Sequence, residues 1–307
     1  LRREAMRAAN ERDADALWAL TEAFIVTKGK KRTTTSLTTL ATYEVGVRRL
    51  LRHFEGENLL RPSRDAGERF VQDLEIGRHG DRPLEPGTIQ VRLAAARALY
   101  RALRWALATE AHPFENVSAP VDNTPPEEKR TAYTDEEIER LLHFASDLDA
   151  VIVLLGADAG LRVSEMLALR WTDVNFSASK LTIQSGKGGK KRTVHPSPDL
   201  MDALEDWKKR HSEDRVMPFT TTAAARYRLK QLCRLANVQY LGLHSLRHSC
   251  GTWLANNSAR GIRDAQKQLG HSSSTTTEIY AKMNDDTLVE AMKRRRHVID
   301  RSKRTAA

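Results

Sequence analysis

Apolar residues recur every three or four positions through most of the chain, which predicts a mainly helical protein. In the first hundred residues this spacing predicts one helix with Ser36 and Thr38 as candidate caps, a second around Phe70–Leu74 and a third that begins at the cap Thr88. A turn-rich stretch, residues 77–87, separates the last two. No strand pattern appears before residue 120, so we expect a helical N-terminal domain.

A break follows between residues 113 and 130, where charged, small and proline residues alternate without periodicity. This stretch contains Pro120, Pro125 and Pro126. Proline fixes φ and removes a backbone donor, so a helix cannot run through here. We therefore predict a helical domain over residues 1–120, a linker over 121–131 and a second domain over 132–307.

The second domain begins with a capping box, in which Thr134 is the N-cap and Glu137 the third helical residue. An apolar helix then ends near Gly160, and Ser164 is placed to cap a short one. Period-two alternation on both sides of the glycine-rich segment 186–191 predicts a β-hairpin. Further helices are expected around residues 223–236, 244–256, 262–269, 274–282 and 286–293. The predicted fold class is mainly α with a small β-sheet or hairpin, the second domain being mixed α/β.

Composition narrows the class of protein. With 40% hydrophobic and 29% charged residues, the chain is too apolar for disorder and too charged for a membrane protein. No apolar run reaches the ~18 residues of a spanning helix, and no signal-peptide core follows Leu1. Two cysteines, Cys233 and Cys250, are too few for a disulfide framework, which favours free thiols and a cytoplasmic setting.

The charge points to a polyanionic partner. Fifty Lys and Arg against forty Asp and Glu give a net charge of +10, typical of proteins that bind nucleic acid. The excess gathers in three clusters, at residues 28–32, 187–192 and 293–296. Amphipathic segments separate them, so we expect a folded protein with several basic surfaces.

Several common sites can be tested against the residues present. The glycine-rich turn is no Walker A loop, because Lys190 is followed by Lys191 instead of Ser or Thr. His244 and His248 stand at zinc-helix spacing with Cys250 nearby, but Ser245 replaces the glutamate of a metalloprotease. No carboxylate cluster suggests a two-metal centre. We therefore predict no metal and no cofactor.

The remaining candidates are a set of cations and one tyrosine. Arg162 lies in the turn after an apolar helix, and His244 and Arg247 share one helix face three residues apart. His271 follows the helix-ending Gly270, and Tyr280 comes nine residues later. Each of them alone is unremarkable as a surface arginine, a core histidine or a core tyrosine. Their joint presence carries the argument.

These residues stand in three segments, AGLRVSEMLALRWTD (159–173), HSLRH (244–248) and LGHSSSTTTEIY (269–280). The segments resemble, in order and spacing, the signature boxes of the tyrosine recombinases, or phage integrase family. The resemblance covers about residues 132–285, with the basic hairpin in the expected place. More weakly, the N-terminal part resembles the helical core-binding domain of that family, through Thr42 and Tyr43 with their apolar stripe and through residues 88–103.

The resemblance implies a role for each residue. Arg162 and Arg247 would bind the oxygens of the scissile phosphate. Tyr280 would be the nucleophile that forms a 3′-phosphotyrosyl link, with His244 as its base and His271 bound to the phosphate. Lys187 would protonate the departing 5′-oxygen, although Lys190 and Lys191 compete for that assignment. Neither ATP nor metal is required, because the link conserves the phosphodiester energy.

The implied function is site-specific recombination of double-stranded DNA. Homo- or hetero-tetramers would exchange strands through a Holliday junction, near the nucleoid and without a membrane or small-molecule substrate. Bases would be read by helices around residues 88–104 and 223–234. The segment after Tyr280 would dock on a neighbouring protomer or on its own domain, with the basic tail 293–304 on DNA. The short stretch before the first predicted helix favours an Xer-like organisation over one with an extra arm-binding domain.

Three alternatives stay open at this point. A type IB-like topoisomerase uses a related cation set and a tyrosine, and one chain cannot distinguish strand exchange from swivelling. A non-catalytic DNA-binding protein could keep the fold without the chemistry, although the six intact positions argue against it. A basic RNA-binding scaffold is more distant, since no aromatic stacking motif supports it.

Overall fold

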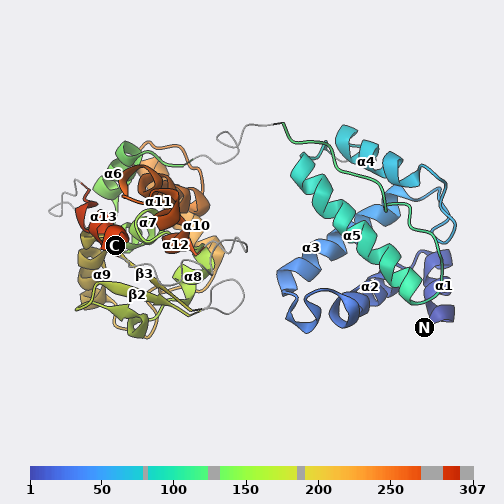
Figure 1. The fold of residues 1–307 in the computed structure, drawn as a ribbon, viewed down its shortest axis with the longest axis horizontal. Coiled ribbons are helices and arrows are strands. Elements are labelled where there is room, and N and C mark those ends of the chain that lie inside the picture. The colour runs from blue at the N-terminus through green and yellow to red at the C-terminus, as the bar shows by residue number, and fades with distance from the viewer. Residues whose placement is uncertain (79–81, 124–131, 185–190, 271–285, 298–307) are drawn as a thin grey trace. The chain divides into compact units, whose positions relative to one another are not determined.

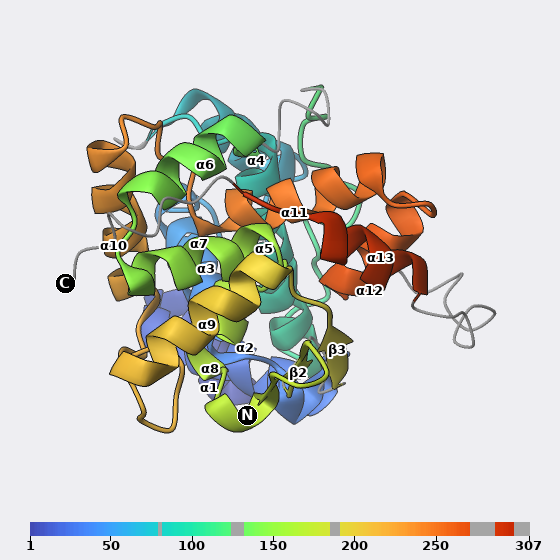
Figure 2. The same cartoon turned by 90° about the vertical axis from the view of Figure 1, so that its left-hand side faces the viewer.

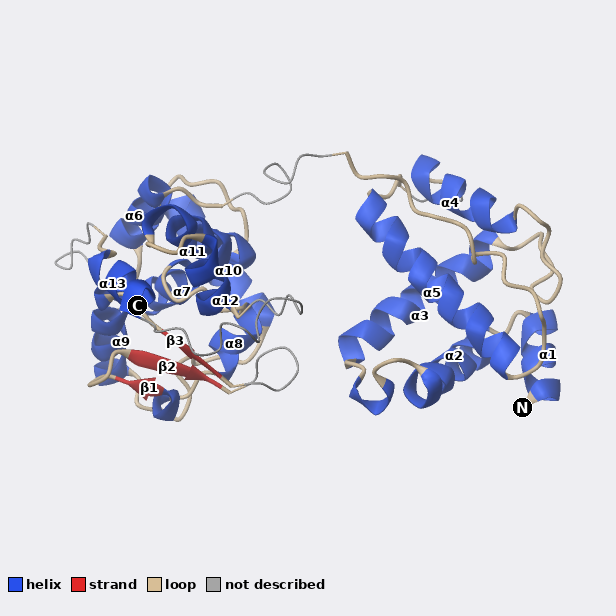
Figure 3. Cartoon of the chain, viewed as in Figure 1, coloured by secondary structure: helices blue, strands red, loops and turns tan. Residues whose placement is uncertain are grey.

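The computed structural model describes residues 1–78, 82–123, 132–184, 191–270 and 286–297. The chain divides into two compact units, residues 1–124 and 125–307 (Figure 1), and the division falls within the proline-bearing stretch 113–130. Helices dominate both units and the described strands form one small sheet (Figure 3), which confirms the predicted fold class. No helix in the described part of the chain is both long and apolar enough to span a membrane.

The first unit is a helical bundle. Its helices are α1 (Arg2–Glu11), α2 (Ala14–Lys28), α3 (Leu37–His53), α4 (Ala66–Ile76) and α5 (Pro86–Trp105), with a 3₁₀ turn at Arg32–Thr34. Helix α5 packs against both α2 and α3 and buries nine side chains, so it forms the centre of the unit. Phe54, Phe70, Tyr100 and Phe114 meet beside it with ring centroids 5.6 to 6.3 Å apart.

Helices α1 and α2 were not predicted, and their sequences explain why. The buried residues of α1 are alanines, which mark a helix less distinctly than the large apolar side chains of the helices that were predicted. Helix α2 is apolar on most sides and therefore lacks a distinct stripe. Of the two candidate caps for α3, Ser36 is confirmed and Thr38 lies inside the helix, and Thr88 is not a cap. Helix α5 begins two residues earlier, at Pro86, because proline at the first helical position sacrifices no intrahelical hydrogen bond.

The second unit surrounds a buried helix. Its elements are α6 (Asp135–Phe144), α7 (Asp147–Ala157), α8 (Val163–Ala168), β1 (Val174–Asn175), β2 (Lys180–Ile183), β3 (Arg192–Val194), α9 (Pro198–Arg210), α10 (Thr222–Leu235), α11 (Leu243–Asn257), α12 (Ile262–Leu269) and α13 (Asp286–Arg294). All but one residue of α7 are buried. Helices α6, α9, α10 and α11 pack around it, and α9 lies alongside it in Figure 2.

The predicted capping box and hairpin are both confirmed. Thr134 accepts a hydrogen bond from the Glu137 amide at 3.2 Å, and the Glu137 side chain accepts one from the Thr134 amide at 2.9 Å. Strands β2 and β3 are antiparallel, with Leu181 opposite Val194. The short β1 and the helix α9 were not predicted. Of the expected later helices, the one over residues 274–282 lies outside the described residues.

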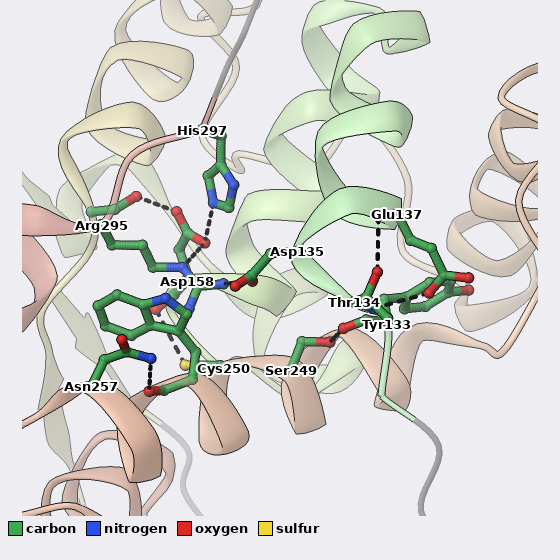
Figure 4. Close-up of polar contacts among 12 residues, drawn as sticks. Tyr133, Thr134, Asp135, Glu137, Asp158, Ser249, Cys250, Asn257, Arg295 and His297 are labelled. Atoms are coloured by element: carbon green, nitrogen blue, oxygen red, sulfur yellow. Dashed lines mark hydrogen bonds and ion pairs between the residues drawn. The ribbon is translucent and has the colours of Figure 1, made fainter.

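The C-terminal segment packs on its own unit. Helix α13 buries Leu288, Ala291 and Met292 against α11 and α12. Beyond it, Arg295 and His297 converge on Asp158, which directly follows α7 (Figure 4). Of the two dockings considered from the sequence, the structure shows the one within the same chain.

Candidate active site

Arg162 is held at the start of α8 by a tight turn. The chain leaves α7 and turns at Gly160, whose φ of +66° favours glycine. A Cβ there would also lie 2.4 Å from the Leu269 side chain, so glycine is needed for the close approach of α12. Arg162 is then the N-cap residue of α8, and its amide donates to the Glu165 carboxylate at 2.9 Å. The predicted cap Ser164 is wrong, because the capping side chain belongs to Glu165.

Arg247 lies in the middle of α11 and is 1% exposed. Its guanidinium donates to the carbonyl oxygens of Gly160 and, at 2.6 Å, of Leu269. It therefore joins the turn before Arg162 to the end of α12, two residues before His271. Burial, together with the charges of Arg162 and Arg192, lowers the pKa of Arg247 to about 10, so the side chain is still cationic at neutral pH.

Glu165 brings the arginines together. Its carboxylate accepts from Arg162 at 2.9 Å and from both terminal nitrogens of Arg192 at 2.7 and 2.8 Å. A nitrogen of Arg247 lies 3.9 Å away. Burial alone would raise the pKa of Glu165, but the hydrogen bonds from Arg192 and from the Arg162 amide outweigh it and lower the pKa. Three arginines and one carboxylate leave this cluster with a net positive charge.

The sequence reasoning missed both Glu165 and Arg192. Glu165 was visible inside the first motif, and its position three residues after Arg162 matches the capping box that was recognised at Thr134. That spacing was the available signal. Arg192 gave none, because one arginine at the end of a basic hairpin looks like the others in its cluster.

His244 lies in the first turn of α11 and is exposed, three residues before Arg247. Its ring meets that of His248 edge-on, with centroids 4.4 Å apart. Cys250 points elsewhere and donates to the Asp158 carbonyl at 3.3 Å. The described residues contain no cluster of histidine, cysteine or carboxylate side chains suited to a metal ion. Cys233 and Cys250 are both buried and form no disulfide, as predicted.

Three predicted site residues, Lys187, His271 and Tyr280, lie outside the described residues, as does Lys190. Lys191 is described and exposed. Among the described candidates, the structure brings Arg162 and Arg247 together and places His244 on the helix of Arg247. Such a cluster of guanidinium groups can hold a tetrahedral phosphate through paired N–H donors.

Residues 132–287 match the sequence model of the phage integrase family. The chain belongs to that family. The predicted resemblance is thereby confirmed, over a range that contains all six candidate residues. The match begins just after the predicted linker and covers most of the second unit.

Curated relatives agree with this membership. The chain is 34% identical over 176 residues to "Tyrosine recombinase XerA" of Pyrococcus furiosus, covering 52% of this chain and 60% of that protein. It is 30% identical over 253 residues to "Tyrosine recombinase XerC" of Pediococcus pentosaceus, covering 74% of this chain and 81% of the relative. The alignment thus spans only 60% of the first relative's length.

Solved structures show the same fold at low identity. A lambda integrase dimer bound to a COC′ core site superposes with a TM-score of 0.66 and 14% identity, over 91% of this chain and 82% of the integrase. A lambda integrase tetramer bound to a Holliday junction gives 0.65 and 14%, over 88% and 82%. At this level of identity the similarity concerns the fold.

Proposed function

We propose that this protein is a site-specific DNA recombinase that cuts and rejoins strands through a covalent link to Tyr280. The observation that supports it most directly is the pairing of Arg162 and Arg247 around Glu165. Two arginines converge there in a unit whose sequence matches the phage integrase family. We assign residues 1–120 to DNA core binding and residues 132–307 to catalysis.

The arginine pair suits a phosphodiester in the transition state. The oxygens of the phosphate gain charge as the nucleophile attacks, and preformed guanidinium donors stabilise that charge without reorganising. Arg247 is buried and fixed by two backbone carbonyls, so its direction is set before DNA binds. Arg162 has a side chain 30% exposed, which leaves donors available to a ligand.

The proposed step is an exchange of ester bonds. The Tyr280 phenol oxygen attacks the scissile phosphorus, the bond to the 5′-oxygen breaks, and a 3′-phosphotyrosyl link forms. His244 takes the phenol proton, Lys187 supplies a proton to the leaving 5′-oxygen, and His271 binds a phosphate oxygen. One phosphodiester replaces another, so no external energy source is needed in this scheme. The expectation that no cofactor takes part stays a prediction.

Exposed cations in both units fit contacts with the DNA backbone. In the first unit they include Lys28, Lys30, Lys31 and Arg32. In the second unit, Arg226, Lys230 and Arg234 are exposed at four-residue spacing along one face of α10. Affinity from such contacts should fall steeply with salt concentration. Of the two helices predicted to read bases, α10 offers the larger exposed face, because four of its 14 residues are buried against nine of 20 in α5.

The assembly is also part of the proposal. The lambda integrase structures are a dimer on a core site and a tetramer on a Holliday junction, and the fold is shared. We propose that four protomers, of this chain alone or with a second recombinase, act on two double-stranded sites. A cytoplasmic location close to the nucleoid follows from that substrate.

Covalent capture tests the function. The full chain, Tyr280→Phe and the control Tyr240→Phe, which alters a half-exposed tyrosine of the same unit, are incubated with nicked duplexes of random sequence and with fragmented genomic DNA. SDS-resistant adducts are then isolated and sequenced. We expect adducts from the wild type and Tyr240→Phe, none from Tyr280→Phe, and a shared sequence motif in the captured DNA.

Other outcomes favour the alternatives. Adducts that depend on Tyr280 but share no motif indicate a relaxing topoisomerase of the type IB kind. DNA binding in a gel shift without any adduct would indicate a non-catalytic DNA-binding protein and contradict the proposed chemistry.

A further inference from the structure

Arg192 makes the most extensive contact with Glu165, yet the phosphate chemistry proposed above gives it no role. It is the first residue of β3, and its side chain is 14% exposed. Its two terminal nitrogens donate to the two carboxylate oxygens of Glu165 at 2.7 and 2.8 Å. This paired geometry is the strongest that an arginine and a carboxylate can form.

The same side chain contacts a second segment of the site. A Cβ on Gly270 would lie 2.7 Å from Arg192 Cδ and 2.9 Å from its Nε, so the arginine packs directly on the Gly270 backbone. Gly270 has a φ of +63° and immediately precedes His271. Arg192 therefore connects the end of the basic hairpin, the first turn of α8 and the end of α12.

Neighbouring contacts strengthen the connection between β3 and α12. The amide of His195 donates to the Gln268 side chain at 3.1 Å, and the Gln268 side chain donates to the His195 carbonyl at 2.7 Å. Gln268 is fully buried. The strand that carries Arg192 is thus fixed to α12 independently of Arg192, and removing this side chain should leave the local fold standing.

The contacts that Arg192 makes with Glu165 determine how many donors of Arg162 and Arg247 remain for a phosphate. Arg192 occupies both carboxylate oxygens, so Arg162 makes one side-chain contact and Arg247 stays 3.9 Å away. Without Arg192, the buried carboxylate would need new donors, and Arg162 and Arg247 are the nearest. Donors turned toward Glu165 are lost to a phosphate. The net charge of the cluster would also fall from about +2 to about +1, which weakens attraction for an anion.

We propose that Arg192 is a positioning residue for strand cleavage, which holds Glu165 so that Arg162 and Arg247 keep their donors for the scissile phosphate. The effect of Arg192 on strand cleavage rests on the proposed function. Phosphate should bind more tightly to this cluster when Arg192 is present, whichever DNA sequence the protein cuts.

A double-mutant cycle tests the route of the effect. Arg192→Gln, Arg192→Lys, Glu165→Gln and the double variant Arg192→Gln/Glu165→Gln are compared with the wild type on a duplex from the capture experiment. The single-turnover cleavage rate at saturating protein and the dissociation constant for DNA are both measured. Arg210→Gln is the matched control, because it removes a 2.9 Å ion pair with the buried Asp147 from the same unit.

We expect Arg192→Gln to lower the cleavage rate about 30- to 100-fold with less than about a threefold change in DNA dissociation constant, as for loss of transition-state stabilisation. Arg192→Lys, with the charge but one contact, should recover part of the rate. In the Glu165→Gln background, Arg192→Gln should have little further effect. Cleavage-rate losses that simply add in the double variant, or a loss of the same size in Arg210→Gln, would overturn the proposal.

A second measurement needs no DNA. Inorganic phosphate is titrated into the full chain while the side-chain Nε–H signals of Arg162 and Arg247 are followed by NMR. Phosphate should shift both signals in the wild type and bind at least about fivefold more weakly to Arg192→Gln. Equal affinity in the two proteins overturns the role of Arg192. If Arg192→Gln binds phosphate more weakly than the wild type but no adducts form at Tyr280, only the proposed function is contradicted.

Discussion

Two buried carboxylates of the second unit, Glu165 and Asp158, stand seven residues apart and both pair with arginine. Around Glu165, the side chains of Arg162 and Arg192 are 30% and 14% exposed. Around Asp158, those of Arg295 and His297 are only 2% and 3% exposed. The chemistry of pairing is the same in both places, whereas access to solvent differs.

That difference separates a binding site from an anchor. The cations beside Glu165 can still turn donors toward an external phosphate. Those beside Asp158 are enclosed: Arg295 donates to Asp158 at 2.7 Å and stacks on Trp253, and His297 lies 2.9 Å from the same carboxylate. Because the charged ends of Arg295 and His297 are buried, we interpret these two residues as holding the C-terminal segment in place.

The largest effect on stability is expected at the anchor. Asp158→Asn leaves Arg295 charged and buried beside a neutral amide, which should lower the free energy of unfolding by about 3–5 kcal/mol. Urea denaturation of the full chain measures this. The double variant Asp158→Asn/Arg295→Met should recover part of the loss, because the uncompensated charge is gone. Equal stability of Asp158→Asn and the wild type would contradict the assignment of Asp158 as the anchor of the C-terminal segment.

At Glu165 we expect the opposite of Asp158: a large effect on catalysis and a small one on stability. Glu165→Gln should lower the cleavage rate about 100-fold, since Arg162 loses the carboxylate that holds its side chain beside Arg247. The cost in stability should be about 1–2 kcal/mol, because Arg162 and Arg192 can reach water once released. Cleavage kinetics and urea denaturation of the same preparation provide both numbers. If Glu165→Gln lowers the free energy of unfolding more than Asp158→Asn does, the assignment of Glu165 to the binding site and Asp158 to the anchor is wrong.

A pH dependence distinguishes the anchor further. Burial lowers the pKa of His297, but the hydrogen bond and charge of Asp158 outweigh it, so the net shift is upward. The stabilisation is therefore complete below the ordinary histidine pKa of about 6.5 and is lost as pH rises through the higher folded value. Between pH 6 and 9, His297→Gln should flatten the decline in unfolding free energy by up to ~1.4 kcal/mol per pH unit, the slope for one proton.

At low pH the opposite sign applies to Asp158. Burial would raise its pKa, but Arg295 and His297 lower it overall, so its contribution is present above about pH 4 and is lost as pH falls through the folded value. A series of urea unfolding curves for wild type and His297→Gln covers both limbs. Parallel curves throughout would show that His297 is not titrating in the anchor.

The smallest effect is expected for an ion pair at the surface. Arg170 and Asp214 pair with side chains 49% and 59% exposed, so water already solvates both charges. Asp214→Asn should change the free energy of unfolding by no more than about 1 kcal/mol. Thermal denaturation at low and at high salt provides the measurement. A loss as large as that of Asp158→Asn would remove burial as the reason for the difference.

Local patterns were sufficient for many elements. The capping box at Thr134, the hairpin strands β2 and β3, and the bounds of α12 follow from neighbouring residues alone. Elements that bury only alanines or contain very few residues were missed, such as α1 and the two-residue β1. Their signal arises from the surfaces against which they pack.

The order and spacing of the motifs determined the family and the candidate residues, because the chemistry of phosphate needs particular side chains. Only the tertiary structure decided how they are held. Glu165 gathers Arg162 from the N-cap of α8, Arg192 from β3 and Arg247 from α11, and Asp158 receives Arg295 from beyond α13. Apart from Arg162 and Glu165, which stand three residues apart, these pairings join residues 27 to 137 positions apart, so no local spacing can reveal them. The cost of burying an unpaired charge makes them form.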